Sequence, residues 1–149
     1  MVEGADRRAV LMSIHPRHAE NLLAGSKTVE LRKSAFGDDV SMVIVYATAP
    51  VKAIVGWLEV ESVERHSPSR IWKLFGDTTG ITRREFRHYF HGHHSAVAIR
   101  VCRPRRLRSP VALTELDPGL AAPQSFRYVP ASTAARLWDG ERNPSALTN

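Results

Sequence analysis

The sequence predicts an α+β domain built as a small mixed β-barrel with short helices at the strand connections. Its 149 residues suit one compact domain, and 43% hydrophobic residues are enough to fill one core. Five or six short segments have strand patterns, and capped helical segments fall between them. Strand and helix do not alternate regularly, so the pattern does not fit a parallel α/β sheet.

The strands are predicted from runs of β-branched and other apolar residues, or from alternation of apolar and polar residues. Gly56 interrupts one strand, and we expect a bulge or tight bend there. Residues 124–129 are a candidate last strand after a turn-rich connection over 117–123. The other predicted strands are residues 10–14, 27–33, 42–47, 53–61 and 96–101.

The helices are predicted from their end signals. Pro16 suits the first turn of a helix that Gly25 ends, and Ser67 is the expected N-cap of a second one. Thr82 and Glu85 form a capping-box pattern for a third. The predicted helices are residues 16–24, 67–76, 82–92 and 131–138. The second and third form one insertion between strands.

The third predicted helix has two distinct sides. Its aromatic side is expected to face the core through Phe86, Tyr89 and Phe90. Its cationic side consists of Arg83, Arg84, Arg87 and His88. A solubilising role is the simpler interpretation of that cationic side.

Charge and composition indicate the class of partner and the compartment. The chain has 21 Lys and Arg against 15 Asp and Glu, a net charge of +6, which favours polyanionic partners. The single Cys102 allows no internal disulfide, and no apolar run reaches membrane-spanning length, so we expect a cytoplasmic protein without membrane contact. Residues 1–9 are expected to be a disordered lead-in, 10–130 the domain, and 131–149 a C-terminal helix and tail.

One octapeptide carries the most specific signal. Residues 25–32, with Gly25, Lys27, Glu30 and Arg32, fit the pattern G-x-K-x-x-E-x-R of ASCH domains, which are PUA-like. Further segments occur in the order of one ASCH subfamily: 46–50, 54–56, 89–92 and 123–128. The chain therefore resembles the ASCH family over roughly residues 10–130.

This resemblance implies a PUA-like barrel whose cationic cleft binds RNA or other nucleic acid, with Lys27, Glu30 and Arg32 at its rim. Strand alternation places Thr28 on the face of Glu30 and Arg32, and the flexible stem of Lys27 can reach the same cleft. A carboxylate fixed between two cations can accept a hydrogen bond from a base and leave a cation for phosphate. The alternative is a solvated surface ion pair between Glu30 and Arg32.

Aromatic residues elsewhere are candidates for base stacking, which contributes about 1–3 kcal/mol per base in single-strand binders. The stacking candidates are Tyr46, Phe126 and Tyr128. The whole predicted nucleic-acid or nucleotide-like ligand site consists of Lys27, Thr28, Glu30, Arg32, Tyr46, Ser125, Phe126 and Arg127.

A hydrolase acting on a modified nucleoside or on RNA is the second hypothesis. Lys27 would be a general base or an oxyanion-stabilising cation, and Glu30 an acid–base group. One ASCH branch resembles amidohydrolases that deacylate acetylated cytidine with a Lys and a Thr three residues later. Glu30 holds that second position here and has no hydroxyl. Thr28, Ser34 and Ser125 remain as hydroxyl candidates.

Another ASCH branch resembles metal-assisted ribonucleases, which directs attention to the histidines. His91, His93 and His94 cluster near a glycine turn, but no Cys or carboxylate close by in sequence completes a coordination sphere. We therefore expect no metal and no cofactor, and a solvated helix end is the simpler interpretation. His15 is expected at the entry of the first helix, and His18 carries no signal.

Two further features leave alternatives open. Arg103, Arg105, Arg106 and Arg108 could contact nucleic acid or could protect a solvated edge strand, since alternation sends them to opposite faces. A third hypothesis is a ligand-sensing regulatory domain with an exposed partner surface around Trp138. RNA, DNA and free nucleosides are all open alternatives, as is the oligomeric state.

Overall fold

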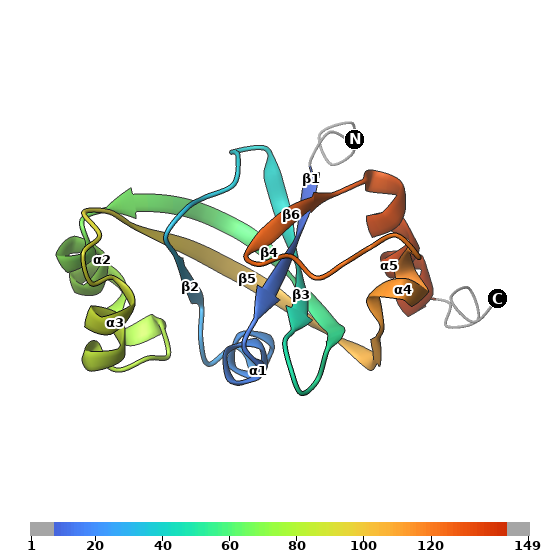
Figure 1. Ribbon diagram of the computed structural model, residues 1–149, viewed down its shortest axis with the longest axis horizontal. Helices are drawn as coiled ribbons and strands as arrows, with labels where there is room; N and C mark the ends of the chain where they lie inside the picture. The colour runs from blue at the N-terminus through green and yellow to red at the C-terminus, as the bar shows by residue number, and fades with distance from the viewer. Residues whose placement is uncertain (1–7, 143–149) are drawn as a thin grey trace.

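The computed structural model describes residues 8–142 (Figure 1). Its elements in chain order are β1 (Arg8–Ile14), α1 (Pro16–Ala24), β2 (Val29–Arg32), β3 (Val40–Ala47), β4 (Ala53–His66), α2 (Pro68–Phe75), the 3-10 helix η1 (Gly76–Thr78), α3 (Arg83–Tyr89), β5 (Ala96–Val111), α4 (Leu113–Leu116), β6 (Phe126–Val129) and α5 (Ala131–Arg142). Within this range, no helix is both long and apolar enough to cross a membrane.

The six strands form one mixed sheet in the order β2-β5-β4-β3-β1-β6. β1 and β3 run parallel, and the other neighbours are antiparallel. The predicted α+β class and mixed sheet are confirmed. The sheet is barrel-like but open, because the described edge strands β2 and β6 do not pair. Each has only four residues, too short a ladder to close a barrel.

Side chains span part of the gap between these two edges. The ring of Phe36, after β2, packs edge-on against Phe126 of β6 with centroids 5.7 Å apart. The backbone N–H of Gly37 donates to the hydroxyl of Tyr128 at 2.9 Å. These contacts hold the two edges close without a ladder of backbone hydrogen bonds.

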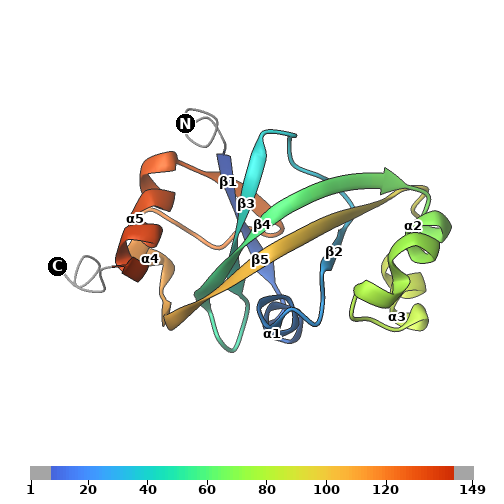
Figure 2. The same cartoon turned by 180° about the vertical axis from the view of Figure 1, so that it is seen from behind.

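β4 and β5 form a long ribbon that extends past the body of the sheet and carries α2 and α3 at its far end (Figure 2). Both strands are longer than predicted, because strand pairing continues through bulges where the sequence pattern breaks. Arg103 and Pro104 occupy one bulge opposite β4. At Gly56, where a bulge was expected and the register shifts, a Cβ would lie 2.3 Å from the carbonyl oxygen of Arg105. Only glycine permits that approach.

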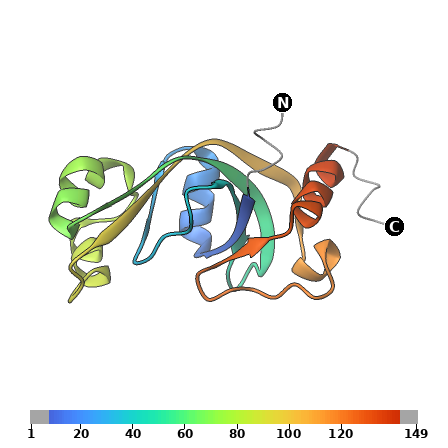
Figure 3. The same ribbon diagram turned by 90° about the horizontal axis from the view of Figure 1, so that it is seen from above.

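Three apolar clusters hold the domain together. The first packs α1 into the concave side of the sheet (Figure 3) and includes Met12, Leu22 and Val45. The second lies against α4 and α5, and in it Trp138 packs on Trp57 with ring centroids 4.4 Å apart. Trp138 is therefore half-buried and does not form the exposed partner surface that was expected. The third cluster joins β2 and β5 to α2 and α3 and includes Ile71, Phe86 and Phe90.

Several local predictions are confirmed, with shifted ends. The helical insertion lies between β4 and β5, and the Thr82–Glu85 capping box forms with hydrogen bonds of 2.9 and 3.1 Å. β1 begins at Arg8, so the last two residues of the predicted lead-in are strand, and residues 1–7 lie outside the described range. α5 extends to Arg142, and the predicted tail at 143–149 also lies outside it.

Candidate functional site

A pocket of about 450 Å³ lies where α1, β2 and the helical insertion meet. β2 lies between α1 and α3 (Figure 1), and all three elements contribute lining residues to the pocket. Its polar and charged lining residues are Ser13, His15, His18, Lys27, Glu30, Arg32, Glu85 and His88, and its apolar or aromatic ones are Leu31, Ile81 and Tyr89. The pocket thus joins parts of the chain that are far apart in sequence.

Lys27 is buried at the start of β2, with 2% of its surface exposed. Its Nζ donates to the carbonyl oxygen of Thr79 and lies 3.5 Å from Oε1 of Glu30. Gly80, at φ +71°, lies over the lysine stem, where a Cβ would come within 3.3 Å of it. Burial lowers the pKa of Lys27, and the neighbouring Glu30 opposes that shift. The insertion therefore covers this amine and excludes water from it.

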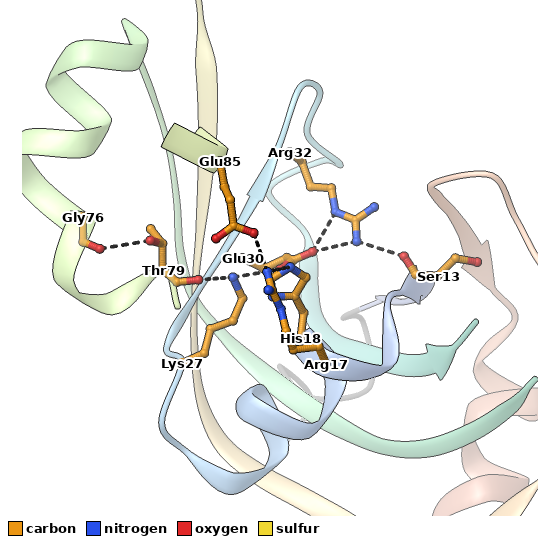
Figure 4. Close-up of polar contacts among 9 residues, drawn as sticks. All are labelled: Ser13, Arg17, His18, Lys27, Glu30, Arg32, Gly76, Thr79 and Glu85. Carbon is orange, nitrogen blue, oxygen red and sulfur yellow. Dashed lines mark hydrogen bonds and ion pairs between the residues drawn. The ribbon is translucent and has the colours of Figure 1, made fainter. Parts of the chain in front are cut away.

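Glu30 is shared between Lys27 and Arg32. Its Oε2 accepts from Nη2 and Nε of Arg32 at 2.7 and 3.1 Å, so the guanidinium binds one carboxylate oxygen through two N–H groups. Arg32 also donates from Nη2 to the carbonyl oxygen of Ser13 at 2.9 Å and from Nη1 to Oγ of Ser125 at 3.4 Å. Figure 4 shows the resulting chain of contacts from Thr79 to Ser13. Arg32 thereby bridges β2 to β1 and the start of β6, across the open side of the sheet.

His18 of α1 enters the same pocket. Its Nε2 lies 3.3 Å from Nη2 of Arg17, and because a guanidinium only donates, Nε2 is the acceptor and Nδ1 carries the proton. Nδ1 is buried and has no hydrogen-bond partner within residues 8–142. Burial lowers the pKa of His18, and the charge of Lys27 lowers it further. The pocket thus contains a neutral imidazole with an unused N–H donor.

Glu85 of α3 forms the opposite wall. The backbone N–H of Thr82 and the guanidinium of Arg17, 2.8 Å away, lower its pKa to about 2. A carboxylate with that pKa is ionised at neutral pH. It ties α3 to α1 across the pocket mouth (Figure 4) and is unsuited to act as a general acid.

Comparison with known proteins identifies the family. A family model described as "Domain of unknown function (DUF365)" matches residues 8–116. The ASCH domain-containing ribonuclease of Zymomonas mobilis is 28% identical over 140 residues, which are 92% of this chain and 95% of that protein. The crystal structure of ASCH from Zymomonas mobilis superposes with a TM-score of 0.84 at 26% identity, covering 90% of this chain and 96% of that one. The chain is an ASCH-domain protein of the DUF365 family.

Another relative is similar to the ASCH domain over part of its own length. The large ribosomal subunit protein uL22 of Ureaplasma parvum is 30% identical over 121 residues. These residues are 80% of this chain but only 39% of that protein. The similarity therefore concerns one segment of the longer relative.

The structure brings four of the predicted site residues together. Lys27, Glu30 and Arg32 line the pocket of the ASCH domain, and Ser125 contacts Arg32. The predicted solvated ion pair between Glu30 and Arg32 is not what forms, since their side chains are only 10% and 13% exposed. The predicted cleft is also not simply cationic, because Glu30 and Glu85 line it together with the two cations.

The other predicted site residues lie outside the pocket lining. Thr28 precedes β2 and is exposed, with its backbone bonded to Thr78 and Val101. Tyr46 is 8% exposed and packs in the second core cluster. Phe126 packs against the first cluster, and Arg127 is exposed on β6. Thr28 and Phe126 each follow a residue of the site, Lys27 and Ser125, but their own side chains lie outside the pocket lining.

Sequence reasoning missed the residues that α1 and α3 contribute. His15 does cap α1, since its Nδ1 accepts from the backbone N–H of Arg17 at 3.1 Å, but it also lines the pocket. Tyr89 was expected in the core, yet it is 36% exposed and lines the pocket, because Phe86 and Phe90 fill the inner side of α3. The capping-box Glu85 was the one available signal, and it suggested only a helix start.

The histidine and arginine clusters lie elsewhere on the ASCH domain. His91, His93 and His94 are exposed beyond α3, and residues 8–142 contain no group of three metal-ligating side chains placed to hold a metal ion. Within the arginine run, Arg103 pairs with Glu59 at 3.0 Å and Arg106 with Glu20 at 2.7 Å. These pairs connect the run to β4 and α1.

The buried lysine makes stability depend on pH. Because burial holds the pKa of Lys27 below 10.5, the unfolded chain binds more protons between the folded value and 10.5, and the free energy of unfolding rises with pH there. We expect the parent protein to gain stability relative to Lys27→Met as the pH rises from neutrality towards 10.5, through the interval between the folded and unfolded pKa values. Urea denaturation of both proteins across this range measures the difference, and a constant difference would contradict the buried amine.

Proposed function

We propose that this ASCH domain binds single-stranded RNA and takes one unpaired nucleotide into the pocket. The observation that carries the proposal is the buried network of Lys27, Glu30 and Arg32 at the pocket floor. Desolvating three charges costs several kcal/mol per ion, and apolar residues would serve folding equally well. Buried polar groups beside a pocket instead provide fixed donors and acceptors for a ligand.

The size of the pocket favours a single strand over a duplex as the ligand. A volume of about 450 Å³ lies in the range of sites for small ligands and is far too small for a duplex. Bases of a single strand are free to leave the stack and enter such a site. The exposed ring of Tyr89 offers a stacking surface to an entering base.

The comparisons support RNA as the ligand class. The Zymomonas relative is named a ribonuclease, and it matches this chain over nearly the full length of both proteins. The net charge of +6 agrees with a polyanionic ligand. A deacylase is less well supported, since Thr28 is exposed outside the pocket and Glu30 occupies the position of the expected nucleophile.

Cleavage of the bound RNA is a second candidate function. Three histidines, His15, His18 and His88, line the same pocket as Lys27. Imidazole has an ordinary pKa near neutrality and is the commonest general acid or base, while a buried ammonium can stabilise charge on a phosphate in the transition state. The pocket therefore contains groups that could move a proton and stabilise an anion.

We expect Lys27→Met to weaken binding of single-stranded RNA at least tenfold. Loss of the amine leaves Arg32 as the only cation in contact with Glu30, so the negative charge of this carboxylate is less well balanced and repels a bound phosphate. Fluorescence polarisation with labelled single-stranded RNA, single-stranded DNA and duplex RNA, each over a salt series, measures the effect. Arg105→Met, which removes one exposed cation from β5, is the matched control.

The same experiment distinguishes the alternatives. The pocket would be ruled out as the RNA site if duplex RNA bound as tightly as single-stranded RNA. It would also be ruled out if Lys27→Met and Arg105→Met lost the same affinity. Competition by unlabelled nucleosides with no response to salt would indicate a nucleoside pocket instead. Gel separation of the RNA after incubation, with and without a divalent cation, tests cleavage. RNA that stays intact would contradict cleavage and leave binding as the proposed function.

A further inference from the structure

The outward side of α3 carries a concentration of positive charge next to the pocket. The insertion from Ser67 to Ser95 has five Lys and Arg against two Asp and Glu, and it also holds four of the seven histidines. One of its two carboxylates, Glu85, is bonded to Arg17 of α1 and does not neutralise the helix's own arginines. The excess charge therefore lies on the exposed surface of the insertion.

Three arginines gather on the one short helix α3. Arg83, Arg84 and Arg87 are exposed, and none of them has an ion-pair partner among residues 8–142. Elsewhere some arginines are paired, namely Arg8 with Asp39, Arg17 with Glu85, Arg100 with Glu61 and Glu64, Arg103 with Glu59, and Arg106 with Glu20, whereas the exposed Arg65, Arg70 and Arg105 are in none of these ion pairs. Three adjacent unpaired cations repel one another, which an anionic partner would relieve.

Helix geometry makes this charge continuous with the pocket. His88 and Tyr89 line the pocket, while Phe86 and Phe90 are buried. At 3.6 residues per turn, Arg84 lies one turn below His88 on the same side, and Arg87 lies next to both on the outer surface. Side chains three or four positions apart have Cβ atoms about 5–6 Å apart. The cationic surface thus begins at the pocket mouth and continues across α3.

We propose that the nucleotides flanking the one in the pocket cross the outer side of α3, where Arg84 and Arg87 bind their phosphates. The inference rests on the proposed function and extends it, because it makes the ligand a strand of several nucleotides and not a free nucleoside. Tyr89, exposed between His88 and the buried Phe90, marks the point where the strand leaves the pocket. An arginine fork binds phosphate oxygens through two N–H groups, so these positions suit backbone contacts without base preference.

The test compares two double variants with the same change in net charge. One variant combines Arg84→Glu with Arg87→Glu on α3. The other, the control, combines Arg105→Glu with Arg108→Glu at exposed positions of β5. Binding of a single-stranded RNA of about twelve nucleotides is measured by fluorescence polarisation over a salt series. A mononucleotide, which fills only the pocket, is measured by its competition against the longer strand.

We expect the α3 variant to bind the long strand at least tenfold more weakly, with a salt slope smaller in magnitude by roughly 1.4, the value for two lost phosphate contacts on a single strand. Its affinity for the mononucleotide should stay within about twofold of the parent, and the β5 variant should resemble the parent. A slope unchanged in the α3 variant, or an equal loss in the β5 variant, would overturn the inference while the pocket function stands. If the parent binds neither the long strand nor the short competitor, both the proposed pocket function and the proposed contact with α3 are overturned.

Discussion

Glu30→Gln is expected to lower the free energy of unfolding by about 3–5 kcal/mol at neutral pH, the cost typical of breaking a buried ion pair from one side. Glu30 is the only carboxylate within residues 8–142 that contacts both Lys27 and Arg32. A glutamine of the same shape still accepts a hydrogen bond from Arg32 but leaves two neighbouring cations without a counter-charge. Urea denaturation of parent and variant measures the loss.

A control and a pH series make this expectation specific. Glu61→Gln removes a carboxylate that is 53% exposed and 3.9 Å from Arg100, and exposed pairs of this kind contribute at most about 1 kcal/mol. In Glu30→Gln, Lys27 can avoid part of the cost by releasing its proton, so the loss should shrink as pH rises. Equal losses in the two variants, or a loss independent of pH, would show that the network is not a buried charge cluster.

Arg32→Lys is expected to reduce stability by about 3 kcal/mol and RNA affinity at least tenfold, although it keeps the positive charge. The guanidinium contacts Glu30, the carbonyl oxygen of Ser13 and Oγ of Ser125 at once, and a single ammonium cannot reach all three. Each hydrogen bond to a charged group contributes about 1.5–3 kcal/mol, and the part-buried Ser13 carbonyl would be left without this donor.

Arg100→Lys is the matched control for this substitution. Arg100 is 42% exposed, and its guanidinium lies 3.8–3.9 Å from Glu61 and Glu64, so a lysine can replace it at little cost. Denaturation and RNA binding are measured on both variants. Retention of stability and binding in Arg32→Lys would mean that the charge alone matters and that Arg32 does not bridge the edges of the sheet.

The charged residues of β2 and the turn before it were predictable because they lie within a few residues of one another in the sequence. Glu30 and Arg32 share one face of a short strand by its period of two, and Lys27 lies at the turn just before it. The capping box of Thr82 and Glu85 is equally local, since its two hydrogen bonds close within one helical turn. Such features depend on a few backbone torsions and need no knowledge of distant contacts.

The closure of the sheet and the lengths of β4 and β5 were not predictable in the same way. Pairing with a partner strand carries β5 through Arg103 and Pro104, residues that by themselves indicate the end of a strand. The open edges result from how few residues in β2 and β6 can pair, which depends on where the chain turns after them. Both outcomes are decided by long-range contacts.

By itself, the sequence determined the class of fold, the helix ends and the charged triplet Lys27, Glu30 and Arg32. Only the tertiary structure decided what surrounds that triplet: α1 brings His18, and the insertion brings Tyr89 and the arginines of α3. The physical reason is that the insertion begins 35 residues after β2 along the chain, and a ribbon of paired strands and an apolar cluster bring it beside that strand. Burial then converts an ordinary surface pattern of charges into a water-excluded network beside a pocket.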